Sequence, residues 1–267
     1  MTSSTPGTTG PPKGAALTHA NLARNADVPA GLFSLDGAAI TLGALPLFHS
    51  FGQTCGMNAT IRGAGCMTLI PRFDPERALR IVERDKVTVF EGVPTMYTAM
   101  LHHPKAATFD VSSLELCVSG GAALPLEVMR NFEKQFGCVI IEGYGLSETS
   151  PVASFNHPDK PRKPGSIGTP VRDVEMKLVE TPNSDDGRVG DSGGIVTRGN
   201  KVRKGGGRGV PGGAPGCEAW DLSERSVTRE TRRGSSDRRH GLSTGSHPPG
   251  VAAATANNPH HIVASPK

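Results

Sequence analysis

The feature that most constrains the fold is a repeated alternation of short apolar strands with helices, which runs from residue 15 to about residue 180. The sequence predicts strands at 41–46, 66–70, 87–90, 114–119 and 139–141. Helices are predicted at 52–63, from 74 onward, at 92–100 and at 125–136. Strand, helix and strand in repetition predict a parallel sheet covered by helices, which is the α/β class.

Local signals mark one helix start. Asp74 suits the N-cap of the helix that opens there, and Pro75 suits the first helical position. Helical spacing then predicts which residues share a face. The expected faces are Ala78, Ile81 and Val82 in this helix and Thr54, Met57 and Ile61 in the 52–63 helix.

Glycine-rich loops follow two of the predicted strands. Gly120 and Gly121 come directly after 114–119, and Gly143 and Gly145 flank Tyr144 after 139–141. In open α/β sheets, ligands bind in the crevice at the carboxyl ends of the strands. The sequence therefore predicts a ligand site to which both loops contribute.

A second candidate ligand loop opens the chain, with the sequence TPGTTGPPKG at residues 5–14. Glycines let backbone amides converge on an anion, threonine hydroxyls add donors, and Lys13 adds a mobile positive charge. The run suits a polyphosphate, although its spacing differs from G-x-x-x-x-G-K-[ST] because no hydroxyl follows the lysine. The alternative interpretation is a flexible terminal segment.

Composition narrows the class further. The formal net charge of +4 does not by itself indicate a nucleic-acid partner, and the Arg and His pairs near the C-terminus have neither metal-ligand spacing nor interleaved aromatics. The five scattered cysteines predict reduced thiols in a cytoplasmic setting. No secretory leader and no membrane-spanning run is predicted.

The chain divides into three parts by composition. Residues 1–180 are expected to form the α/β core, and 181–205 to belong to a small antiparallel β region. Residues 206–267 are rich in Gly, Pro, Ser, Arg and His without apolar periodicity, so they are predicted to stay disordered. This last part is read either as a genuine extension or as out-of-frame translation.

Five segments, in order, resemble motifs of the adenylate-forming (AMP-binding) superfamily. They are the phosphate loop at 5–14, LTHAN at 17–21, LPLFHSFG at 45–52, SGGAALP at 119–125 and GYGLSET at 143–149. His49 and the GYGLSET run are typical of the fatty-acyl-CoA synthetase branch. The resemblance implies partial coverage of an N-terminal adenylate-forming domain, with ATP and Mg²⁺ as cofactors, coenzyme A as co-substrate and a fatty acid as substrate.

The resemblance also implies roles for single residues. Lys13, Glu148 and His49 are the expected catalytic residues: Lys13 at the phosphates, Glu148 as the Mg²⁺ ligand, and His49 at the mouth of the acyl pocket. Tyr144 would stack on adenine, and Ser147 would reach the α-phosphate. The expected nucleotide-binding set is Thr5, Gly7, Thr8, Thr9, Gly10, Lys13, Gly120, Gly121, Ala122, Tyr144, Gly145 and Ser147.

The chain departs from the family pattern in ways that bear on activity. Pro6 stands where Ser or Thr is usual, which removes a backbone N–H and a hydroxyl from the loop. No T-G-D motif, D-R-x-K-like hinge or C-terminal catalytic lysine is found in the 267 residues. The sequence thus predicts a fatty-acid–CoA ligase by descent, truncated and impaired. The alternatives are an inactive remnant that binds nucleotide or a protein partner and, more distantly, a basic interaction protein.

Overall fold

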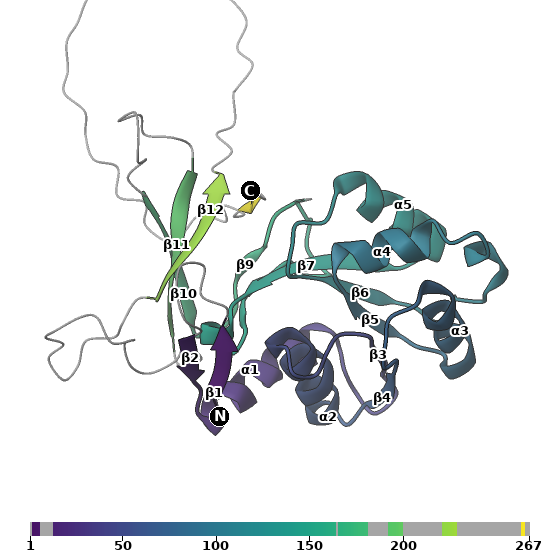
Figure 1. The fold of residues 1–267 in the computed structure, drawn as a ribbon, viewed down its shortest axis with the longest axis horizontal. Helices are drawn as coiled ribbons and strands as arrows, with labels where there is room; N and C mark the ends of the chain where they lie inside the picture. Colours follow the sequence, from purple (N-terminus) through teal and green to yellow (C-terminus); the bar gives the residue numbers. More distant parts are fainter. Residues whose placement is uncertain are drawn as a thin grey trace, which may run out of the picture.

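The computed structural model describes residues 2–5, 13–163, 165–180, 192–199, 221–228 and 263–264. Its centre is a seven-stranded sheet in the order β4-β3-β5-β6-β7-β8-β9 (Figure 1). The strands are β3 Ile40–Gly43, β4 Cys66–Leu69, β5 Val89–Gly92, β6 Leu116–Ser119, β7 Val139–Gly145, β8 Val152–Phe155 and β9 Thr169–Pro170. The first five strands of this order are parallel, and β8 and β9 are added antiparallel, so the predicted α/β fold class is confirmed.

Helices cover both faces of this sheet. They are α1 His19–Leu32, the π-helix η1 Gly52–Asn58, α2 Ala59–Arg62, α3 Pro75–Asp85, α4 Pro94–Leu101 and α5 Leu126–Phe136, with 3-10 turns η2 Ala106–Thr108 and η3 Ser147–Thr149. One apolar cluster packs α3, α4 and α5 on one face, and a second packs α1, η1 and α2 on the other (Figure 1). The sheet is therefore sandwiched between two helical layers.

The start of α3 follows the predicted capping signals. The Asp74 carboxylate accepts a hydrogen bond from the backbone N–H of Arg77 at 2.9 Å, and Pro75 begins the helix. Ala78 and Val82 are buried as predicted, whereas Leu79 is fully buried and Ile81 only half-buried. The buried stripe is thus shifted slightly from the predicted one.

The predicted 52–63 helix forms, but not as one α-helix. Its first half is π-helical and only 59–62 is α-helical. The predicted face is wrong at Ile61, which is 70% exposed, while Thr54 is buried. Because a π-helix closes i→i+5 hydrogen bonds, its side chains follow a longer repeat than the α-helical spacing on which the prediction depended.

Two smaller antiparallel units accompany the sheet. Strands β10 Val174–Glu180, β11 Ser192–Gly199, β12 Asp221–Thr228 and β13 Val263–Ala264 form one, and β1 Thr2–Thr5 pairs with β2 Lys13–Ala16 in the other. The β10–β11 pair matches the antiparallel strands predicted before residue 200. Strands β12 and β13 fall in the stretch predicted to stay disordered. Strands can pair through their backbones along an open sheet edge without an apolar pattern of side chains. Composition therefore does not reveal such pairing. The rest of 206–267 lies outside the described residues.

Two further sequence predictions concern cysteines and the membrane. The four described cysteines are free; Cys55, Cys117 and Cys138 are buried, and Cys66 is exposed. Within the described part of the chain, no helix is long and apolar enough to cross a bilayer.

Candidate functional site

The two ends of the predicted phosphate loop lie side by side. Thr5, the last residue of β1, pairs with Lys13, the first residue of β2, so the loop between them closes a hairpin. Gly7, Thr8, Thr9 and Gly10 lie outside the described residues, and their predicted roles stay predictions. Both strands of the hairpin contact η3, the turn that carries Ser147 and Glu148. Two motifs far apart in sequence are thereby brought together.

A buried asparagine holds the η3 turn in place. Asn25 of α1 is fully buried, and its side-chain amide donates to the carbonyls of Thr149 and Val152 at 3.0 Å each. Its oxygen accepts from the N–H of Val152 at 3.1 Å. Sequence analysis missed Asn25, because a polar residue inside a helix is ordinarily exposed. Helix α1 was equally missed, although Thr18 and Asn21 form a capping box at its start.

Ser147 and Glu148 are half-buried in this turn. The Thr149 hydroxyl donates to the carbonyl of Leu146 at 3.0 Å, and the N–H of Leu146 donates back to that hydroxyl at 3.0 Å. These local bonds fix the turn from which the Glu148 side chain projects. Carboxylate and hydroxyl are thus presented next to the hairpin that carries Lys13.

Tyr144 lies on β7 immediately before this turn. Its side chain is only 7% exposed and packs with Ala153 and Ile167. The ring therefore packs in the core of this part of the sheet. The proposed stacking role stays a prediction. Gly145, the next residue, is exposed at the end of the strand.

The Gly120 loop lies at the neighbouring strand end. Ser119 of β6 is in register with Glu142 of β7, so Gly120 and Gly143 follow where the pairing of these two strands ends, and β7 continues to Gly145. Gly121 has φ +81°, which favours glycine, and both Gly121 and Ala122 are exposed. The geometry leaves backbone accessible at the position predicted for the purine.

A buried carboxylate positions this loop. Glu142 is 5% exposed, and its two oxygens accept from the N–H of Leu124 at 3.2 Å and of Gly165 at 3.0 Å. Burial raises the pKa of Glu142, while these two hydrogen bonds and Arg162 oppose the rise. The side chain ties the end of the 119–125 loop to the segment that follows β8. Its place within a strand gave no sequence signal for this role.

The predicted acyl-pocket segment meets the Gly120 loop. A Cβ atom on Gly120 would lie 3.0 Å from the ring of Phe51, so this ring packs directly on the glycine. His49 is exposed two residues earlier, and its Nδ1 accepts from the N–H of Phe51 at 3.2 Å. This local hydrogen bond is enough to hold His49 in the turn, and the gating role of His49 stays a prediction.

Comparison with known families decides the identity of this arrangement. The family described as AMP-binding enzyme matches residues 4–205, which contain all five motif segments. The chain belongs to the AMP-binding enzyme family. This membership agrees with the resemblance carried by the motifs and with the sheet topology.

Characterised members of the AMP-binding family include close relatives. The chain is 42% identical over 203 residues to a long-chain-fatty-acid–CoA ligase of Bacillus subtilis (strain 168), covering 75% of this chain and 36% of the relative. It is 36% identical over 207 residues to a feruloyl-CoA synthase of an Amycolatopsis species, covering 75% of this chain and 41% of that protein. The chain therefore spans little more than a third of the length of these relatives.

Solved structures of AMP-binding enzymes share the fold. ATP-bound MatB from Rhodopseudomonas palustris superposes with a TM-score of 0.68 at 32% identity, over 76% of this chain and 40% of that one. The anthranilate CoA ligase AuaEII in complex with anthranoyl-AMP gives a TM-score of 0.70 at 25% identity, over 85% of this chain and 44% of that one. The described sheet is thus the sheet of the N-terminal adenylate-forming domain.

Proposed function

We propose that this chain carries the nucleotide- and acyl-binding part of a fatty-acid–CoA ligase. The observation that carries the proposal is the contact between the hairpin bearing Thr5 and Lys13 and the turn bearing Ser147 and Glu148. The 42% identity to a long-chain-fatty-acid–CoA ligase supports a fatty acid as the acyl substrate. The reaction is the joining of a carboxylate to ATP, followed by transfer of the acyl group to a thiol.

In the first step the protein needs to neutralise the negative charge on the departing pyrophosphate and forms no covalent bond to the substrate. A carboxylate oxygen attacks the α-phosphorus, the bond to the bridging oxygen breaks, and pyrophosphate leaves with the electron pair. Lys13 and the hairpin amides would bind the departing phosphates, and Ser147 would donate to the α-phosphate. In the second step the thiol of coenzyme A replaces AMP at the acyl carbon.

Mg²⁺ fits this site as part of the Mg·ATP substrate. Within the described residues, no group of three or more His, Cys, Asp or Glu side chains could hold a metal ion. Mg²⁺ is commonly bound by one or two carboxylates together with substrate phosphates and water. Glu148 is half-buried next to the hairpin and supplies such a single carboxylate.

On the adenine side, the exposed backbone at Gly121 and Ala122 would let a purine approach closely. Tyr144 would support the base from the neighbouring strand end, and the Phe51 ring against Gly120 would separate the purine from the acyl chain. His49, two residues before Phe51 in the 45–52 segment, would face the acyl carboxylate. These four roles follow from family membership together with the adjacency of the two strand ends.

A second candidate function is nucleotide binding without completed adenylation. Pro6 favours it, because proline in the phosphate loop lacks the N–H and hydroxyl that would contact phosphate. In this case the chain binds Mg·ATP and fatty acid but releases no pyrophosphate.

Binding and turnover assays separate the two functions. Mg·ATP binding is measured by calorimetry for the wild-type chain and for Lys13→Ala and Glu148→Ala. Lys134→Ala and Glu127→Ala on the exposed side of α5 are matched controls. Both site variants are expected to bind Mg·ATP about tenfold more weakly, while both controls bind it as the wild type does. Pyrophosphate release with fatty acid then distinguishes the ligase from the binding-only protein, and a wild-type chain that binds no Mg·ATP contradicts both.

A further inference from the structure

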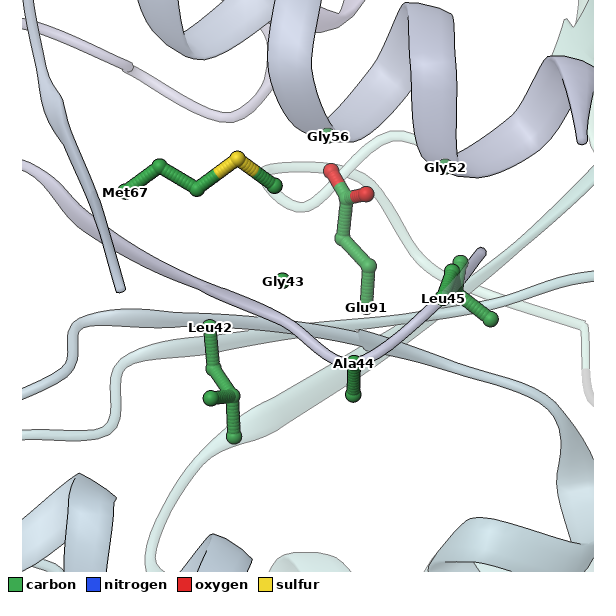
Figure 2. Close-up of a pocket in the computed structure, with 8 residues that line it drawn as sticks. All are labelled: Leu42, Gly43, Ala44, Leu45, Gly52, Gly56, Met67 and Glu91. Carbon is green, nitrogen blue, oxygen red and sulfur yellow. The ribbon is translucent and has the colours of Figure 1, made fainter. Parts of the chain in front are cut away.

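Glu91 is a buried carboxyl without a described partner. It lies in β5, is 2% exposed, and its Oε1 has no hydrogen-bond partner among the described residues. Figure 2 shows the side chain directed from the strand toward the π-helix, ending near Gly56 and the methyl end of Met67. A Cβ atom on Gly56 would lie 3.1 Å from Oε2 of Glu91. The carboxyl thus ends in an apolar slot between sheet and helix.

Glu142 is a buried carboxyl of the same sheet that has hydrogen-bond partners, in contrast to Glu91. Both carboxyls are buried on neighbouring parts of one sheet, yet Glu142 accepts two backbone hydrogen bonds. An unpartnered buried polar group is costly, so a side chain with only a structural role would be expected to have partners. Burial raises the pKa of Glu91 to about 8, so near neutral pH it is mainly protonated and can both donate and accept.

The slot adjoins the predicted acyl site. It is lined by Leu42, Gly43, Ala44, Leu45, Gly52, Gly56, Met67 and Glu91 (Figure 2). Leu45 and Gly52 are the first and last residues of the 45–52 segment, which contains Phe51, the ring that packs on Gly120. The residue after Glu91, Gly92, accepts a hydrogen bond from the N–H of Gly120 at 3.3 Å. Glu91 is therefore the residue before Gly92, whose backbone is hydrogen-bonded to the Gly120 loop on the predicted adenine side.

We propose that Glu91 selects acyl substrates that carry a hydroxyl group, by hydrogen bonding to that hydroxyl in the slot beneath η1. This inference rests on the proposed function, because it assigns the acyl chain to this slot. A hydroxyl both donates and accepts, as a protonated carboxyl does, so the pair satisfies both partners. A plain alkyl chain would leave the carboxyl without a partner.

The side chain of Met67 fills part of this slot. In this structure the slot is too narrow for a water molecule, and the methyl carbon of Met67 occupies the space beside two glycines. A Cβ atom on Gly43 would lie 2.5 Å from that methyl carbon, and one on Gly56 would lie 3.2 Å from it. Methionine is unbranched and flexible, so its side chain can withdraw when a chain enters. The acyl chain then takes the place of the Met67 methyl end.

The test compares binding of straight-chain fatty acids of equal length, unsubstituted or with one hydroxyl placed at successive positions. The wild-type chain, in the presence of Mg·ATP, is expected to prefer at least one hydroxylated acid by about tenfold, the effect of leaving one buried polar group unpaired. Glu91→Leu is expected to abolish or reverse that preference, and Glu91→Gln to retain most of it. Glu115→Leu, at an exposed position before the next strand, is the control and should change nothing.

The outcomes distinguish this inference from the proposed function. Equal binding of all acids by the wild-type chain overturns the role of Glu91 and leaves the ligase assignment intact. Binding of Mg·ATP without any acid also overturns it, and binding of neither ligand overturns both. The preference for hydroxylated acids is measured on the wild-type chain alone. The test therefore still holds if a Glu91 variant fails to fold. Met67→Ala, which widens the slot, should strengthen binding of all acids that enter it.

Discussion

At the scale of single residues, burial and hydrogen bonding set the protonation state of each carboxyl. Glu91 is held neutral by burial alone, whereas Glu142 is buried but stabilised by two backbone donors. Asp85 shows the opposite shift: the Arg84 guanidinium and the Thr68 hydroxyl lower its pKa to about 2. Glu91 and Asp85 therefore titrate in different pH ranges.

The first prediction concerns Glu91 and pH. Its pKa is 4.5 as an ordinary glutamate and about 8 in the fold, so the folded state binds the proton more tightly. The stability that protonation contributes is complete below pH 4.5, declines as pH rises, and is lost above about 8. Glu91→Gln should remove this decline, which we expect to be on the order of a few kcal/mol.

Urea unfolding of the wild type and Glu91→Gln at both ends of this window measures the effect. The difference between the two proteins isolates Glu91 from Glu142, whose pKa is also raised, and Asp85 titrates below the window. Parallel pH profiles for the two proteins would show that the Glu91 carboxyl is hydrated or partnered in solution.

At the scale of elements, a single side chain couples helix α1 to the turn that presents Glu148. We predict that Asn25→Ala destabilises the chain by about 2–4 kcal/mol, because two backbone carbonyls and one N–H lose their buried partner. It should also weaken Mg·ATP binding, since η3 is no longer fixed. Thermal unfolding and calorimetry measure both effects, with Asn131→Ala on the exposed side of α5 as control. An unchanged melting temperature would contradict the positioning role.

Two glycines allow a matched test of helix geometry. Gly137 ends α5 with φ +68°, a left-handed conformation, whereas Gly31 lies inside α1 with no atom within 4 Å of an added Cβ. Gly137→Ala should destabilise by about 1 kcal/mol, and Gly31→Ala should stabilise by about 0.5–1 kcal/mol. Chemical denaturation of the two variants checks this pair, and effects of the same sign would contradict the geometric explanation.

The elements that sequence could predict were those whose signals are local. Asp74 and Pro75 mark the start of α3, and continuous apolar runs mark β5, β6 and β7, because capping and burial act within a few residues. The π-helix η1 was not predictable, since its apolar pattern was judged against an α-helical repeat. The burial of Asn25 and Glu91 was not predictable either. Whether a buried polar side chain has hydrogen-bond partners depends on residues distant in the sequence, so only the tertiary structure reveals it.

At the scale of the whole molecule, the candidate site exists because distant segments meet. The order of motifs along the chain was visible in the sequence, and the parallel sheet places Gly120 and Gly143 at neighbouring strand ends. The contact of the β1–β2 hairpin with η3 joins the start of the chain to a turn after β7, so no local signal predicts it, and only the family resemblance placed both segments at one nucleotide. Ligand binding across this contact should therefore depend on both segments together.

The last prediction uses that dependence. Lys13 and Glu148 are expected to act on the same Mg²⁺–triphosphate group from two segments in contact, so their contributions to Mg·ATP binding should not be independent. We expect each alanine variant to weaken binding about tenfold, as loss of a charge-assisted contact does. The double variant should be weaker by clearly less than the product, a coupling of about 1 kcal/mol or more. Calorimetric titration with Mg·ATP completes the cycle, and the pair Lys134→Ala and Glu127→Ala on α5 should show no coupling. Strictly additive losses at Lys13 and Glu148 would mean that the two segments bind nucleotide separately and that their contact in the fold is not the site.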